Sequence, residues 1–302
     1  MKMAESQITV GNVEVIGLSD AALDHRLALD RIFPSVPAEA WEAYRQTYPA
    51  TFGGRHVWHF NVGCYLVRSQ GRTLLVDTGL GPAGGEIANS LQAPGGGCLF
   101  EELRSAGYRP EEVDVVLLTH LHRDHVGWNL RQEGSSCRLS FPRARYIVHQ
   151  ADWDTFHRPE VQEALSLTYL EQAITPLQRL GGLDLISGDL KITDEVTAMH
   201  TPGHTPGHMS VLIASGGRSA VITGDVVVHP AQVADADQSF VYDMDVEAAR
   251  QTRHRLLERI EAEGMVMAGG HLPEPGFGRL VRAEGGRRWE ALQDQREWSA
   301  LV

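Results

Sequence analysis

Three histidines and an aspartate are crowded into one short window of the chain, residues 119–125, which read Thr-His-Leu-His-Arg-Asp-His. The window directly follows an apolar segment, residues 113–118, that is typical of a buried strand. Imidazole loses solvation when it is buried, so core packing does not explain the cluster. Nitrogen and oxygen donors at this spacing are ligands that zinc prefers, with manganese, iron or cobalt as alternatives. The window therefore predicts a metal site where a strand ends.

The spacing of these four residues favours two ions over one. If the strand geometry persists, His120 and His122 point to the same side. Asp124 and His125 can turn toward that side only if the chain bends there into a loop or a helix start. Four ligands on so short a loop do not easily enclose one ion tetrahedrally. We therefore expect the His-x-His pair to bind one ion and the Asp-His pair to bind a second.

Further donors follow other expected strand ends, and strands that end at one edge of a sheet would bring them together. These donors are His200, His204 and His208 in glycine-proline turns, Asp225 at the end of a hairpin, and His271 after an apolar segment. A carboxylate such as that of Asp225 can bridge two cations. The remaining histidines have no such partners and are expected to be ordinary solvent-exposed or core residues: His25, His56, His59, His149, His157 and His254.

Hairpins and helices are the elements that must position these donors. Residues 8–18, 64–79 and 210–225 each read as strand, tight turn and strand. The last two hairpins end in an aspartate, Asp77 or Asp225, which suggests two similar halves.

Helices are expected at Phe100–Ala106 and at Val246–Glu263, the second capped by Asp245 and ended by Gly264. Residues 19–60 and 150–185 show no strand pattern and are expected to be loops and helices over the core. Without a long linker, one mixed α/β (α+β) domain over residues 1–302 is the prediction.

Composition excludes several classes of protein. The 302 residues carry a net charge of -12, which repels nucleic acid. No apolar run approaches the roughly 20 residues of a membrane span, and the first residues lack a secretory signal. Three scattered cysteines without a CxxC argue against a disulfide framework and a thiolate zinc site. We expect a cytoplasmic protein that acts on neutral small molecules, and a homodimer is compatible with these features.

The donor pattern resembles the metallo-β-lactamase-fold superfamily, in which His-x-His-x-Asp-His is followed by a His, an Asp and a His. The matching regions occur in that order between residues 77 and 271. The resemblance implies an αββα sandwich, with two β-sheets face to face and helices outside. It also implies a ligand set: His120, His122 and His204 for one metal, Asp124, His125 and His271 for the other, and Asp225 between them.

The resemblance also separates ligands from supporting residues. His204 is preferred to His208 because the family ligand is the histidine of Gly-His-Thr, residues 203–205 here. His200 and His208 would then support the ligands. Asp77 matches the family's buried aspartate that orients ligand histidines.

Within the superfamily, four segments resemble the lactonase branch, which includes quorum-quenching N-acyl homoserine lactonases and methyl parathion hydrolase. The segments are residues 61–82, 119–129, 224–233 and 269–280. The resemblance implies two divalent ions, zinc first, and a metal-bridging hydroxide that opens a lactone or cleaves a related carboxylic ester. Zinc β-lactamases carry Cys where Asp225 stands, so antibiotic hydrolysis is disfavoured. Phosphotriester hydrolysis and a mono-iron persulfide dioxygenase are the alternatives.

Two residues are expected to assist catalysis. Asp124 would protonate the leaving alkoxide, directly or through a water. Lactonases place a tyrosine three residues after the bridging aspartate, whereas this chain has Val228 there, with His229 next. His229 could donate a hydrogen bond to the substrate, in which case His229→Ala should slow the hydrolysis of lactones more than that of aryl esters. Alternatively, His229 only fixes the loop before Pro230. Four aromatic residues are candidates for an apolar substrate pocket or for plain core packing: Phe52, Trp58, Phe60 and Trp128.

Overall fold

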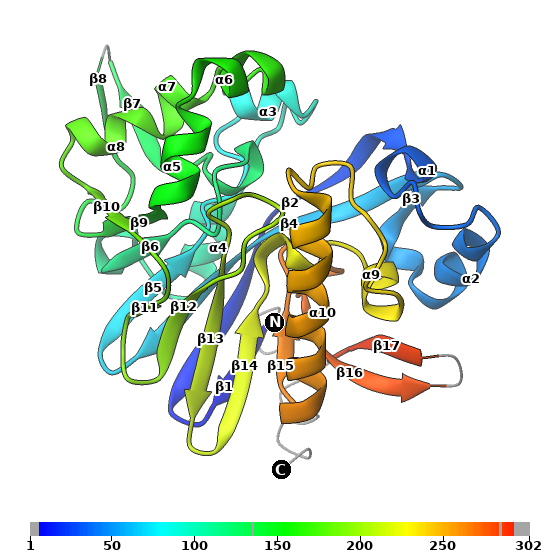
Figure 1. The fold of residues 1–302 in the computed structure, drawn as a ribbon. Helices are drawn as coiled ribbons and strands as arrows, with labels where there is room; N and C mark the ends of the chain where they lie inside the picture. Colours follow the sequence, from blue (N-terminus) through cyan, green and yellow to red (C-terminus); the bar gives the residue numbers. More distant parts are fainter. Residues whose placement is uncertain (1–5, 135, 284–285, 293–302) are drawn as a thin grey trace.

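Two β-sheets form the centre of the structure, a computed structural model that describes residues 6–134, 136–283 and 286–292 (Figure 1). The first sheet has the order β1-β2-β4-β5-β6-β9-β10, and β3 pairs with β4. Its strands are β1 (Gln7–Val10), β2 (Val13–Ala28), β3 (Phe52–Gly54), β4 (Val57–Ser69), β5 (Arg72–Val76), β6 (Val115–Leu117), β9 (Arg145–His149) and β10 (Leu183–Ile186).

The second sheet has the order β11-β12-β13-β14-β15-β16-β17. Its strands are β11 (Leu190–Lys191), β12 (Val196–His200), β13 (Met209–Ser215), β14 (Arg218–Ile222), β15 (Val266–Ala268), β16 (Phe277–Ala283) and β17 (Gly286–Ala291). A short third sheet pairs β7 (Leu130–Glu133) with β8 (Ser136–Leu139).

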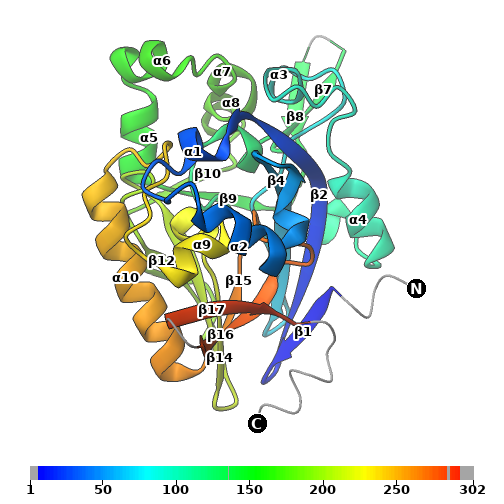
Figure 2. The same ribbon diagram turned by 90° about the vertical axis from the view of Figure 1, so that its right-hand side faces the viewer.

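Helices lie outside the two sheets, with α10 on one side and α4 on the other (Figure 2). The α-helices are α1 (Leu29–Ile32), α2 (Ala40–Thr47), α3 (Glu86–Ser90), α4 (Leu99–Ser105), α5 (Gln150–Phe156), α6 (Pro159–Leu165), α7 (Leu170–Ala173), α8 (Thr175–Arg179), α9 (Pro230–Ala234) and α10 (Val246–Glu263). Single 3-10 turns are η1 (Pro49–Thr51), η2 (Pro110–Glu112), η3 (Arg123–His125) and η4 (Gly224–Val226). No helix among the described residues combines the length and the apolar character that crossing a membrane requires.

Three of the four buried apolar cores among the described residues define the layers. Successive side chains of a strand point to opposite faces, so in β5 Leu74 and Val76 pack between the two sheets while Leu75 packs toward the helices of the first sheet. The outer face of the second sheet is covered by Leu257 and Ile260 of α10. The order helix, sheet, sheet, helix confirms the expected αββα sandwich of mixed α and β structure. The single domain over residues 1–302 stays a prediction.

The local predictions are confirmed where short-range patterns decide the structure. The three expected hairpins are β1–β2, β4–β5 and β13–β14. Helix α4 begins and ends one residue before the expected bounds, and α10 has the expected ones. The Asp245 side chain accepts a hydrogen bond from the Ala248 N–H at 3.0 Å, and Gly264 ends the helix with a φ of 61°. The two aspartate-ended hairpins lie in different sheets, and each is followed by a parallel strand, β6 or β15.

The expectation of loops and helices over residues 19–60 is wrong in part. Strand β2 continues to Ala28, and β3 and the start of β4 also fall in this segment. Register shifts between Ser19 and Ala21, and between Asp24 and Ala28, interrupt the alternation that marks a strand in a sequence. The C-terminal part of β2 extends beyond the core, and its side chains are half-buried or exposed. This part of the strand therefore has no apolar face by which the sequence could predict it. Likewise β10 begins at Leu183, inside the segment 150–185 that was expected to lack strands.

Candidate metal centre

All seven predicted ligands lie where strands end, at one edge of the paired sheets. His120 and His122 follow β6, and the chain then bends into η3, which carries Asp124 and His125. This is the bend that the tight spacing required. The remaining three ligands come from the loop between β12 and β13, from η4 after β14, and from the loop after β15: His204, Asp225 and His271. Parts of the chain up to 151 residues apart in number therefore meet at one place.

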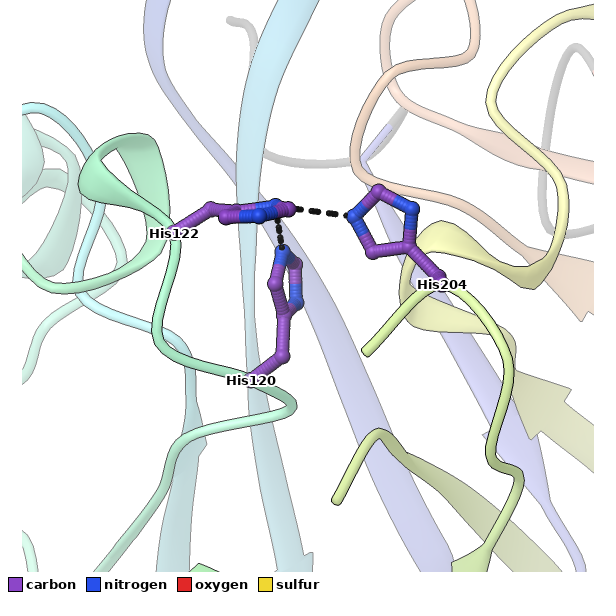
Figure 3. A group of neighbouring side chains, drawn as sticks. All are labelled: His120, His122 and His204. Carbon is purple, nitrogen blue, oxygen red and sulfur yellow. Dashed lines mark hydrogen bonds between the residues drawn. The ribbon is translucent and has the colours of Figure 1, made fainter. Parts of the chain in front are cut away.

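Three imidazoles form the first donor group (Figure 3). His122 Nδ1 lies 3.0 Å from His120 Nε2 and 2.9 Å from His204 Nε2. Thr119 Oγ1 uses its hydrogen to bond Asp77 at 2.8 Å, so at 3.0 Å His120 Nδ1 must be the donor to Thr119 Oγ1. His120 Nε2 is then an unprotonated acceptor that faces the other two rings.

The tautomer of His204 can be assigned in the same way. Its Nδ1 lies 3.0 Å from Asp243 Oδ1, a carboxylate oxygen that can only accept, so Nδ1 donates and Nε2 keeps its lone pair. The single Nδ1 of His122 cannot donate a hydrogen to both neighbouring nitrogens. A cation among the three nitrogens satisfies all of them at once, so this group fits a metal ion.

The second donor group combines Asp124, His125 and His271. His271 Nε2 and His125 Nε2 lie 3.5 Å and 3.9 Å from Asp124 Oδ2. The far nitrogens again donate away from the centre, His125 Nδ1 to Asp77 Oδ2 and His271 Nδ1 to the Asn61 carbonyl, each at 2.8 Å. Outer partners of this kind fix the ring orientation and the tautomer of metal-binding histidines.

Asp225 lies between the two groups. Its Oδ2 is 3.4 Å from His204 Nε2 and 3.3 Å from His271 Nε2, and its Oδ1 is 3.5 Å from His125 Nε2. One carboxylate thus reaches the nitrogens of both donor groups. Asp225 Oδ1 and His125 Nε2 are buried and make no hydrogen bond to any residue that the structure describes, a costly state that a bound cation would relieve.

The electrostatics of the site suit cations. Burial, followed by the neighbouring imidazoles, holds the pKa of His120 and of His122 well below its ordinary value, which keeps these rings neutral and able to bind metal. Burial alone would lower the pKa of His125 too, but the carboxylates of Asp225 and Asp77 raise it to about 10. The carboxylates therefore favour positive charge at this place, which divalent ions would supply.

His208 and His200 do not join the donor groups. His208 Nε2 accepts the Asp225 backbone N–H at 2.9 Å, and its Nδ1 lies 2.9 Å from Thr201 Oγ1. His208 therefore holds the backbone of the shared carboxylate. His200 Nε2 lies 2.9 Å from the Pro206 carbonyl, and its ring stacks on His149. His200 thus bridges the two ends of the turn that carries His204.

No local pattern in the sequence points to Asp243 and Arg253, which support the first donor group. Arg253 in α10 is 1% exposed, and its Nη2 donates to Asp243 Oδ2 at 3.1 Å. The same guanidinium donates to the carbonyls of Val226, Ala236 and Gln238 at 2.8–3.1 Å. It therefore connects the residue after Asp225 with the loop that carries Asp243. Neither residue belongs to a local motif, so only the folded chain reveals the connection.

We expect Asp243→Asn to lower metal affinity and turnover by roughly 10- to 100-fold, the usual cost of losing a residue that orients a ligand. The amide removes the charge that pairs with buried Arg253, and breaking such a pair costs about 3–5 kcal/mol of stability. Elemental analysis after dialysis and denaturant unfolding check both effects. Asp237→Asn is the matched control, because Asp237 lies in the same loop with an exposed side chain that pairs with His254. Equal metal loss in the two variants would contradict the supporting role of Asp243.

A cavity of about 540 Å³ opens over the two donor groups. Its wall includes Leu23, Trp58, Phe60, Leu167, Tyr169 and Phe240, together with ligand side chains. Of the four aromatic candidates, Trp58 and Phe60 line it. Trp128 instead donates to Asp20 at 3.0 Å and packs on Phe100, and Phe52 packs against Trp41, so these two are packing residues. His25, expected to be an ordinary histidine, lines the cavity.

The structure does not bring His229 to the cavity. His229 is fully buried, and its Nδ1 accepts the Ala231 N–H at 3.0 Å, which caps α9. Its Nε2 lies 3.2 Å from Thr51 Oγ1, and Phe33 and Trp41 pack on the ring. Since Thr51 Oγ1 gives its own hydrogen to the Tyr48 carbonyl, the Nε2 hydrogen of His229 is used here and not on a substrate. The expectation that His229 donates a hydrogen bond to the substrate is therefore wrong for this geometry. The contacts match the alternative, in which His229 fixes its loop.

His229→Ala should lower stability without changing substrate preference. The lost cap costs about 1 kcal/mol, and emptying a fully buried aromatic position adds on the order of 3 kcal/mol. His229→Asn is the control, since Asn Oδ1 can take the place of Nδ1 as the capping acceptor. Denaturant unfolding measures the first effect, and the ratio of lactone to aryl-ester turnover measures the second. A selective loss on lactones would restore His229 to the catalytic residues.

Comparisons with known proteins agree with the fold. The family model described as the metallo-beta-lactamase superfamily matches residues 58–133 and 139–271. An N-acyl homoserine lactonase of Bacillus cereus is 26% identical over 250 residues, which cover 78% of this chain and 91% of that protein.

Two solved structures superpose over nearly the whole chain. The hydrolase AbOPH of the beta lactamase superfamily has a TM-score of 0.81 and 26% identity, covering 97% of this chain and 98% of that one. AidC, a dizinc quorum-quenching lactonase in complex with a product, has a TM-score of 0.78 and covers 95% of this chain and 96% of that one. At 21% identity the likeness to AidC shows the fold alone.

Proposed function

The chain belongs to the metallo-β-lactamase superfamily, and from this premise we propose that it is a dinuclear metal-dependent hydrolase that opens lactones or cleaves related carboxylic esters. The observation that carries the proposal is the shared carboxylate: Asp225 reaches the nitrogens of two donor groups at 3.3–3.5 Å, below an apolar cavity. A mono-iron dioxygenase would use only one of these groups. The names of the relatives support the lactone as the first substrate to test.

Each donor group would hold one ion. Zinc is the ion that we propose, and manganese, iron and cobalt are the alternatives. The ligands would be His120, His122 and His204 for one ion, Asp124, His125 and His271 for the other, and Asp225 for both. Two ions at such a site supply a nucleophile from water at neutral pH and polarise the oxygen that gains charge.

The protein itself supplies orientation and exclusion of water. Outer hydrogen bonds to Asp77, Asp243 and the Asn61 carbonyl fix the ligand rings before substrate arrives. Asp124 is the most accessible of the donor carboxylates, with a side chain 16% exposed at the cavity wall. We assign it the exchange of a proton with the substrate's leaving oxygen, directly or through a water.

The cavity wall suits a neutral substrate with an apolar acyl or aryl part. Its exposed surface is mainly apolar, contributed largely by leucine and aromatic side chains. A bound acyl chain would rest on Leu23, Leu167 and Tyr169.

The deciding experiment gives the apoprotein, reconstituted separately with each of the four metals, a panel of substrates. The panel contains acyl-homoserine lactones of several chain lengths, simple lactones, aryl esters, a phosphotriester and a cephalosporin. We expect metal-dependent opening of lactones and cleavage of esters, and no cephalosporin hydrolysis. Turnover of the phosphotriester alone would replace the proposal with organophosphate hydrolysis, and inactivity on every ester would overturn it.

A further inference from the structure

Tyr242 and His25 face each other across the wall of the cavity. Tyr242 Oη lies 3.0 Å from His25 Nε2, and both residues line the same cavity as five of the metal-site residues. His25 lies near the far end of β2, and Tyr242 lies in the loop between α9 and α10.

The Tyr242 loop is fixed to the metal centre. Asp243, the next residue, accepts one hydrogen bond from His204 Nδ1 and another from the guanidinium of Arg253. The Met244 N–H bonds the His204 carbonyl at 3.0 Å. On the other side, the Val241 N–H bonds the Ile32 carbonyl at 2.9 Å. The Tyr242 backbone is thus held from both sides, beside a ligand histidine.

The direction of the hydrogen bond between the two side chains can be assigned. His25 Nδ1 accepts the Leu27 N–H at 3.0 Å, so in the neutral ring the hydrogen is on Nε2. Burial lowers the pKa of His25, which keeps the ring neutral. His25 Nε2–H then donates to the phenol oxygen. Burial raises the pKa of Tyr242, so the phenol keeps its own hydrogen.

The phenol hydrogen is free for a ligand. Tyr242 Oη has no second hydrogen-bond partner among residues 6–134, 136–283 and 286–292, and Tyr242 lines the cavity. Because Oη already accepts a hydrogen bond from His25, its own O–H is polarised and is the stronger donor for it.

On the basis of the proposed function, we infer that Tyr242 is a catalytic residue that donates a hydrogen bond to the leaving oxygen of the substrate, with His25 as its positioning residue. The ions that the buried ligands would hold would polarise the carbonyl oxygen, whereas Tyr242 lines the cavity, is 44% exposed and would meet a part of the substrate that extends outward. Val228, the residue three positions after Asp225, is fully buried and has no polar side chain to do this.

Atoms balance without a further reactant. The oxygen of one water bonds to the acyl carbon, and the bond between that carbon and the leaving oxygen breaks. The leaving oxygen ends with one proton of the water, and the other proton is released as the acid ionises. The Tyr242 hydroxyl stabilises the charge on the leaving oxygen while it builds, and the phenol loses no proton overall.

Tyr242→Phe tests the donor with two matched substrates. Removing a hydrogen bond to a charged oxygen should cost roughly 10- to 100-fold in kcat for a lactone or alkyl ester. A nitrophenyl ester of the same acid needs little help for its leaving group, so its kcat should change less than about threefold. Metal content, measured by elemental analysis, should stay at the wild-type level. Equal losses on both substrates, or lost metal, would overturn the role of Tyr242.

His25 is tested by a conservative pair of variants. His25→Gln can keep an N–H donor to Tyr242 and should retain most of the lactone activity, whereas His25→Phe should lose it in part. Adding His25→Phe to Tyr242→Phe should cause little further loss, because residues that act through one hydrogen bond are not additive. Additive losses, or equal losses in His25→Gln and His25→Phe, would remove the positioning role.

Product binding gives a readout without turnover. Metal-loaded wild-type protein should bind the ring-opened hydroxy acid about fivefold more tightly than the same acid without the hydroxyl, and Tyr242→Phe should lose this preference. A preference that survives in the variant would overturn the inference. A wild type that hydrolyses neither ester overturns the proposed function and this inference with it, whereas equal losses on an active enzyme overturn this inference alone.

Discussion

Asp225→Ala should remove metal from both halves of the site and abolish turnover. Within the described part of the chain, Asp225 is the one carboxylate that reaches the nitrogens of His204, His125 and His271, at 3.3–3.5 Å. Without Asp225, no shared carboxylate lies between the two donor groups. Two neighbouring divalent cations would then repel each other more strongly, because the negative charge that offsets their repulsion is removed. The loss of activity should exceed the roughly 10- to 100-fold that follows from changing a residue behind the ligands.

Elemental analysis of the dialysed protein checks the expectation, which is fewer than two ions per chain with both donor groups affected. Asp225→Asn separates charge from shape, because the amide keeps an oxygen donor but not the negative charge. Asp237→Asn again serves as the unaffected control. Circular dichroism should show that the sheets remain folded, since Asp225 is not a member of the three apolar cores between and outside the sheets. Two tightly held ions in Asp225→Ala would contradict the bridging assignment.

The donors were predictable because their signals are local. The crowding of His120, His122, Asp124 and His125 into six residues has no explanation in packing, and it follows an apolar strand that fixes its place at a sheet edge. Hairpins and α10 were predictable for the same reason, since turn residues, caps and alternation act over a few positions. The pairing of the two sheets came from the family resemblance and not from any local pattern.

Two of the supporting groups, Asp243 and the Asn61 carbonyl, were not predictable, because each acts over a long separation in the chain. Asp243 reaches His204 across 39 positions, and the Asn61 carbonyl reaches His271 across 210. An isolated histidine such as His25 is unremarkable until the register of β2 and β4 sets it against Trp58 and Phe60. His229 misled the prediction in the opposite direction, since closeness to Asp225 in the sequence is not closeness to the cavity in the fold.

A comparison of His204→Ala with His208→Ala tests the part of the ligand set for which the sequence offered two choices. Both histidines are buried in the loop between β12 and β13, so the two variants remove equal volumes from similar surroundings. They differ in what the ring nitrogens contact. His204 Nε2 faces His122 and Asp225, whereas His208 Nε2 accepts the Asp225 N–H.

His204→Ala should therefore retain about one ion per chain and lose nearly all turnover, because the first donor group is left with two nitrogens. His208→Ala should retain both ions and lose roughly 10- to 100-fold in kcat, because only the support of the Asp225 backbone is removed. Elemental analysis and turnover of one lactone measure both outcomes on the same preparations. If His208→Ala were inactive with one ion and His204→Ala mildly affected with two, then His208 would be the ligand. Such a result would require the turn to rearrange when metal binds, since the lone pair of His208 Nε2 already accepts the Asp225 N–H at 2.9 Å.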